Sequence, residues 1–110
     1  MLVAKNSLTL LQNVENENLY SELVAQLNKD FLLSNIEIRF EPTTPPVALK
    51  KMLSDLLLRL ITERYDDYLN LLYRIDVSEK ELLNTKGGEI HILVENIAFT
   101  ILKRELQKEG

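Results

Sequence analysis

The chain contains very few residues that interrupt a helix, and this feature constrains its fold more than any other. Three prolines fall within residues 42–46, and the three glycines stand at Gly87, Gly88 and the last position. Leucine, by contrast, supplies 23 of the 110 residues. Straight-chain side chains of this kind lose little rotamer freedom in a helix. The sequence therefore predicts helices that are separated at a small number of points.

Two segments have the apolar spacing of amphipathic helices. In residues 17–34 the apolar residues stand three and four positions apart, at Leu19, Leu23, Val24, Leu27 and Phe31. A second helix is expected from Pro45 to about Glu63, with Thr44 as its N-cap and proline in its first turn. Its predicted core stripe has six members, Leu49, Met52, Leu53, Leu56, Leu57 and Leu60, and Leu58 points away from them.

Residues 65–75 continue the helical spacing on a rotated face, and the pattern leaves three arrangements open. A kink near Arg64, two helices that meet there, and one uninterrupted helix all fit. Asp66 and Asp67 suit the first turn of a new helix. Farther along, residues 78–81 match a capping box and predict a short helix through Asn84. A last helix is expected over residues 89–108, after the glycine pair.

Residues 36–40 are ambiguous between a strand and an extended connector. Ile36, Ile38 and Phe40 alternate with charged residues, which is the period of a half-buried strand. A strand needs a partner, however, and the only other extended candidates lie in the first ten residues. The alternative is a connector that docks its three apolar side chains on the helices.

These assignments define an all-α fold, a small helical bundle of three long helices plus one or two short ones. At 110 residues the chain has room for one core and no second one. We expect an N-terminal arm, residues 1–16, and a single helical-bundle domain, residues 17–110. The arm fits a short helix capped by Ser7 and a strand equally, so we expect it to be loosely docked.

Composition excludes several classes of function. With 17 acidic and 13 basic residues the net charge is −4, which argues against nucleic-acid binding. The absence of cysteine excludes disulfides, thiol nucleophiles and cysteine-ligated metals. The longest uncharged run, residues 6–14, is too short to cross a membrane, and no signal-peptide pattern is visible. A cytoplasmic protein without nucleic-acid or membrane partners is expected.

The candidate chemistry rests on the single histidine. His91 and Glu95 stand four residues apart on the last helix and share a face, so an added Asp66 or Asp67 from another helix would complete a metal site. The alternative is an ordinary surface histidine near a helix start. His91 and Glu95 are thus weak metal candidates. No catalytic or cofactor-binding residue is assigned and no cofactor is predicted, since phosphate loops and nucleophile elbows are absent from the sequence.

Tyr65, Tyr68 and Tyr73 place three phenols within nine residues. Such rings can stack on bases or line a pocket. Because few basic residues are interleaved with them, we favour tyrosines at the core boundary, with buried rings and solvated hydroxyls.

The last helix carries apolar residues on nearly all sides. Ile92 and Phe99 form a second face beside its main stripe, and Leu102 fills a third sector. A helix of this kind is either central in its own bundle or pressed against another molecule. We favour an interface and add Leu58 from the second helix, so the predicted contact residues are Ile92, Phe99, Leu58 and Leu102.

These features favour a protein-interaction module, a homodimer in the simplest case, without evident enzymatic activity. In a symmetric dimer the same patch would be used twice. Two alternatives remain open at this stage. One is a small metal-assisted enzyme that uses His91 and Glu95, and the other is an adaptor or regulator that binds a different protein.

Overall fold

Helices make up most of the chain. The computed structural model describes residues 6–77 and 89–109, and within these ranges five helices and no strand occur. They are α1 (Ser7–Asn16), α2 (Tyr20–Leu33), α3 (Pro46–Glu63), α4 (Tyr65–Ile75) and α6 (Ile90–Glu109). The predicted all-α bundle is confirmed. The short helix expected at 78–84 and the glycine pair lie outside the described residues.

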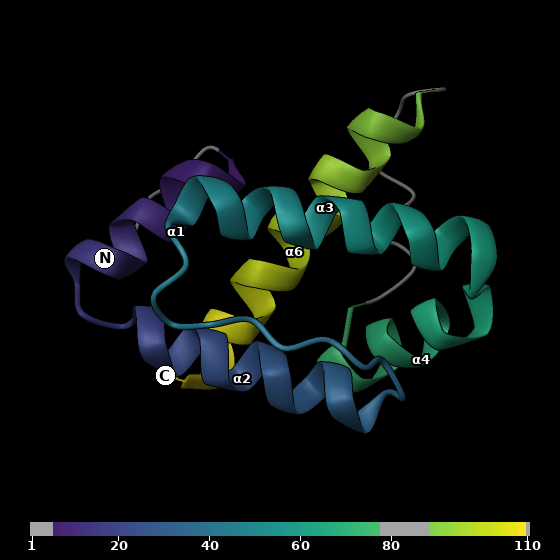
Figure 1. Cartoon of the computed structure of the whole chain (residues 1–110), viewed down its shortest axis with the longest axis horizontal. Coiled ribbons are helices and arrows are strands. Elements are labelled where there is room, and N and C mark those ends of the chain that lie inside the picture. Colours follow the sequence, from purple (N-terminus) through teal and green to yellow (C-terminus); the bar gives the residue numbers. More distant parts are fainter. Residues whose placement is uncertain (1–5, 78–88, 110) are drawn as a thin grey trace.

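The last helix lies at the centre of the bundle. Figure 1 shows α3 along one side and α2 along the other, with α6 running diagonally behind and between them. Within the described ranges, α6 contacts each of the other four helices. The radius of gyration of 13.0 Å is what a compact chain of this length is expected to have. In the described residues, no helix combines the length and apolarity of a membrane span.

One continuous core joins the helices. It includes three residues of α2, Leu23, Leu27 and Phe31, all fully buried. The stripe predicted for α3 is buried at Leu49, Leu53, Leu57 and Leu60, whereas Leu56 is partly buried and Met52 is about one-third exposed. From α6 the core receives Val94, Ile97, Ala98, Ile101 and Leu102.

The segment before residue 17 belongs to this core. Residues 7–16 form a helix rather than a strand, and α1 packs on both α3 and α6. Leu10, Leu11 and Val14 are buried, so the described part of the segment is not the loosely docked arm that we expected. The cap is Asn6 instead of Ser7, because the Asn6 Oδ1 accepts the Thr9 N–H at 2.9 Å.

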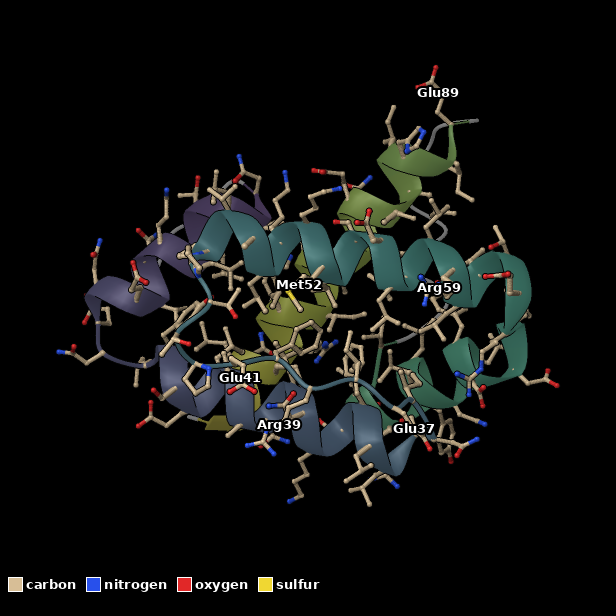
Figure 2. The ribbon with its side chains drawn as sticks, in the orientation of Figure 1. Glu37, Arg39, Glu41, Met52, Arg59 and Glu89 are labelled. Carbon is tan, nitrogen blue, oxygen red and sulfur yellow. The ribbon has the colours of Figure 1, made fainter. Side chains whose placement is uncertain are left out.

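Residues 36–40 form a connector that lies between α2 and α3 and covers the core (Figure 1). Ile36 and Phe40 are buried, while Glu37, Arg39 and Glu41 are exposed, as Figure 2 shows. The side chain of Asn28 accepts the Phe40 N–H at 2.7 Å and donates to the Phe40 carbonyl at 2.9 Å. Here an amide side chain supplies both hydrogen bonds that a neighbouring strand would supply. This is why the segment stays extended without joining a sheet.

Three helices end in the same way. Asn18, Asn35 and Asp76 follow α1, α2 and α4, and each has a positive φ, between 61° and 67°. After each of them, the next N–H donates to a carbonyl five residues back, as in Ile36 to Phe31 at 2.9 Å. This is the Schellman motif, in which asparagine or aspartate replaces the usual glycine.

Of the three arrangements considered for residues 45–75, the structure has two separate helices. α3 ends at Glu63, and Arg64, with φ −139° and ψ 57°, starts α4 in a new direction. Thr44 does not cap α3 through its side chain, because Pro45 holds the N-cap position. Instead the Thr44 carbonyl accepts the Tyr20 hydroxyl at 2.7 Å.

Candidate functional site

The structure does not place the four predicted interface residues on a common exposed surface. Leu102 is fully buried, so it belongs to the core of this chain. Leu58 and Phe99 are partly buried and pack against that core, and the Lys103 ammonium lies 4.5 Å from the centre of the Phe99 ring. Only Ile92, at 46% exposure, presents much of its side chain to solvent.

The apolar residues around α6 are explained by its central position. This helix contacts α1, α2, α3 and α4, and its buried residues run from Val94 to Glu105. Its first turns project beyond α3, where Glu89 marks the tip in Figure 2, and the exposed Ile92 lies in this projecting part. Burial inside the chain therefore accounts for Leu102 fully and for Leu58 and Phe99 in part, whereas Ile92 stays exposed.

The residues of the hypothetical metal site have other partners or positions. His91 is exposed in the first turn of α6. Glu95 Oε1 lies 3.1 Å from Lys50 Nζ of α3, and Asp67 Oδ2 lies 2.6 Å from Arg64 Nη2. Over residues 6–77 and 89–109, no group of three or more histidine, cysteine, aspartate or glutamate side chains is placed to hold a metal. The expected constellation is not assembled in this part of the chain.

The three tyrosines of α4 do not share one environment. Tyr68 is buried, and its ring centre lies 5.6 Å from that of Tyr65. Burial, and secondarily the neighbouring Tyr65, raises the pKa of Tyr68 to about 12. Tyr65 is about half exposed and Tyr73 is 89% exposed, so the expectation of three buried rings is wrong for these two. Tyr73 is an aromatic side chain held almost entirely in water.

Exposed apolar side chains gather where the end of α2 meets α4. Leu33, the last residue of α2, is 53% exposed. It lines an open hollow of about 460 Å³ together with Ser34, Asn35, Asn70, Tyr73 and Arg74. Leu69 lies one turn before Tyr73 and is also exposed. We call this surface the α2–α4 face and define it as Leu33, Asn35, Leu69, Asn70, Tyr73 and Arg74.

Local hydrogen bonds hold the two sides of this face together. The Schellman motif at Asn35 ends α2 and turns the chain away, which leaves Leu33 at the rim. The carbonyl of Asn35 then accepts a hydrogen bond from Arg64 Nη2 at 2.9 Å. The same nitrogen contacts Asp67 in the first turn of α4. Arg64 thus links the end of α2 to the start of α4.

Chemically the face combines apolar area with groups that make hydrogen bonds. Leucine and the tyrosine ring offer surface whose burial is favourable. The amides of Asn35 and Asn70 both donate and accept, and Arg74 carries a positive charge. A surface of this composition is suited to contact with another protein.

Two buried acids were not recognised from the sequence. Asp30 and Glu105 are both almost fully buried, and Asp30 Oδ2 accepts a hydrogen bond from Gln26 Nε2 at 3.0 Å. The helical spacing places both acids on the buried side of their helices. Asp30 stands three residues after Leu27, and Glu105 stands four residues after Ile101. Charged side chains in such positions are rarely buried unless they are paired.

Comparison of the chain with protein-family models, with curated proteins and with solved structures gave no match. Its own geometry is therefore the basis for assigning a function. On the α2–α4 face, exposed apolar side chains, a hollow and hydrogen-bonding groups coincide.

Proposed function

We propose that this protein is an interaction module that binds protein through the α2–α4 face, in the first place a second copy of itself. The observation that carries the proposal is the exposure of Tyr73 beside Leu33 at the hollow between α2 and α4. Binding would act by removing this apolar area from water. No chemical step is part of the proposal.

The free energy of such contacts is concentrated in a few side chains. Tyrosine and arginine are enriched among the residues that dominate binding. On the α2–α4 face Tyr73 and Arg74 are adjacent, and Leu33 and Leu69 flank them with apolar surface. A partner that covers this group would bury an aromatic ring at low entropic cost, because a tyrosine has only two rotatable side-chain bonds.

This face is favoured over the surface expected from the sequence. Leu102 contributes nothing outside the core, and Leu58 and Phe99 are already partly covered by their own chain. Ile92 is exposed in isolation on the projecting end of α6, and single exposed apolar residues are ordinary. The α2–α4 face instead combines several such residues around one hollow.

The test is the mass in solution, measured by size-exclusion chromatography with light scattering over a range of concentrations. We expect a dimer, with twice the mass of the 12.7 kDa chain, and the fraction of chains in the dimer should rise with concentration. Tyr73→Glu should weaken the association about tenfold or more, because it places a charge at the centre of the face. Its stability should change little, since Tyr73 is 89% exposed.

Ile92→Glu is the matched control, because it introduces the same charge at an exposed apolar position of α6. It should retain the association of the wild type. Loss of association in Ile92→Glu with retention in Tyr73→Glu would assign the contact to α6 and contradict the proposal. A mass of 12.7 kDa at every concentration would contradict self-association altogether.

A further inference from the structure

The outer side of α4 carries two parallel rows of exposed side chains. One row has Tyr65, Leu69 and Tyr73, spaced four residues apart. Residues four apart lie above one another on the same side of a helix. The second row, displaced by one residue, has Asp66, Asn70 and Arg74, and all six side chains are exposed.

The charges of the second row match those of an identical row that runs in the opposite direction. It begins with a negative charge in the first turn, has an amide in the middle and ends with a positive charge in the last turn. If a second α4 is laid against it in the opposite direction, each aspartate faces an arginine. The central amides face each other, and an amide can both donate and accept a hydrogen bond.

The apolar row has the same property. Reversal brings Leu69 opposite its own counterpart and Tyr73 opposite the partner's Tyr65. A two-fold axis that passes between the two α4 helices at the level of Leu69 and Asn70, perpendicular to both, produces both sets of contacts at once. A parallel two-fold pair would instead place the apolar row of each helix against the polar row of its partner, so neither the charges nor the apolar side chains would be matched. Antiparallel helix dipoles add to the preference.

We propose that two copies of this chain pair through antiparallel α4 helices, with Asp66 of each copy facing the partner's Arg74. The inference rests on the proposed function, since the contact takes in the α4 part of the α2–α4 face and extends it along α4 to Tyr65 and Asp66. It adds the direction in which the second copy is placed and the residues that select it. Tyr73 of one copy is then covered by the partner's Tyr65, beside the hollow that Leu33 and Arg74 line.

Charge exchange tests this arrangement. Asp66→Arg and Arg74→Asp should each weaken self-association about tenfold or more, since each variant places like charges at two positions of its homodimer. The double variant D66R/R74D should regain the association of the wild type. Light scattering over a concentration series measures all four proteins.

A mixing experiment avoids dependence on the double variant. Asp66→Arg and Arg74→Asp, each weakly associated alone, should combine with each other, because every facing pair in the mixed dimer then has opposite charges. Light scattering of the equimolar mixture should show the dimer mass at concentrations where each variant alone is monomeric. Circular dichroism and urea unfolding of each variant check that the helices remain intact.

Arg59→Asp in α3 and Asp55→Arg in α3 are the matched controls. They make the same charge changes at exposed positions of α3, outside the two rows of α4, and they should leave the association unchanged.

The outcomes separate this inference from the proposed function. If Tyr73→Glu disrupts the dimer but neither the double variant nor the mixture recovers it, the face is correct and the antiparallel arrangement is wrong. If both Tyr73→Glu and the charge variants associate like the wild type, the face itself is wrong.

Discussion

α4 and α6 show two different reasons for apolar residues to appear outside a single helical stripe. α6 has them on almost all sides, and it is surrounded by four other helices. α4 has one well-defined buried side, with Tyr68, Leu71, Leu72 and Ile75, and it still exposes Leu69 and two tyrosines on the other. The more evenly apolar helix is thus the one with more of its apolar residues buried inside its own chain.

The difference shows how an apolar excess should be judged. Hydrophobic residues on every side of a helix indicate burial when the rest of the chain can surround it. A helix whose core side is already satisfied has no such explanation for large apolar side chains on its outer side. The exposed residues of α4 therefore carry more information about a partner than the more numerous ones of α6.

The largest effect should come from the centre of α6. Leu102→Ala removes a fully buried side chain, and we expect the free energy of unfolding to fall by about 2–5 kcal/mol. Ile92→Ala, on the projecting end of the same helix, should cost less than about 1 kcal/mol. Urea unfolding followed by circular dichroism measures both. Equal losses in the two variants would mean that α6 is not central.

A smaller effect is expected where α4 is fastened to α2. Arg64→Ala removes the hydrogen bond to the Asn35 carbonyl and the contact with Asp67, and should cost about 1 kcal/mol. Arg59→Ala is the control, since its guanidinium lies 4.0 Å from the exposed Glu63 carboxylate and should contribute less than about 0.5 kcal/mol. If the two variants are equally stable, Arg64 does not hold the α2–α4 face together.

The free energy of unfolding should depend on pH above pH 10, because two tyrosine hydroxyls are buried. Burial, with a smaller contribution from Tyr65, raises the pKa of Tyr68 to about 12, and burial together with Glu15 raises that of Tyr20 to about 12. The unfolded chain loses these protons near pH 10, before the folded protein does. The contribution to stability is therefore complete below pH 10 and is lost as the pH rises towards 12.

Urea unfolding at pH 8 and at pH 11 measures this loss. Tyr68→Phe should lose less stability between the two pH values than the wild type, and Tyr20→Phe/Tyr68→Phe should lose least. For each protein, the free energy of unfolding at pH 11 is compared with its own value at pH 8. Because the phenols are neutral at pH 8, this difference does not include the effect of the substitution on the neutral form. An unchanged loss in both variants would show that these hydroxyls are not buried.

The smallest effect should occur on the outer side of α4. Tyr73→Ser removes an almost fully exposed ring, and the free energy of unfolding should change by no more than about 0.5 kcal/mol. The measurement is made at a concentration where the protein is monomeric, so that association does not contribute. A loss as large as that of Leu102→Ala would contradict the contrast between α4 and α6.

Much of the fold follows from local patterns. The spacing of Leu23, Leu27 and Phe31 predicted the buried side of α2, and Asn35 lies where the helix was expected to end. Asp66 and Asp67 indicated that a helix can begin near Arg64, and the structure places the start of α4 there. These features were predictable because periodicity and helix termini depend on residues within one or two turns.

The choices that the sequence left open depended on residues far along the chain. Residues 36–40 stay unpaired because Asn28, twelve positions earlier, bonds both backbone groups of Phe40. Residues 7–16 are part of the core because α3 and α6 cover them. The candidate site was missed for the same reason, since Leu33 and Tyr73 are forty residues apart and only the packing of α2 on α4 brings them to one hollow.

By itself the sequence determined the helical class and most of the buried stripes of α2 and α3, because few residues interrupt a helix and the apolar spacing is local. Only the tertiary structure decided that most of the apolar residues around α6 are buried and that Tyr65, Leu69 and Tyr73 on the outer side of α4 are exposed. Exposure is a property of what lies next to a side chain. For a helix that is apolar on several sides, the neighbours come from distant segments that no local pattern identifies.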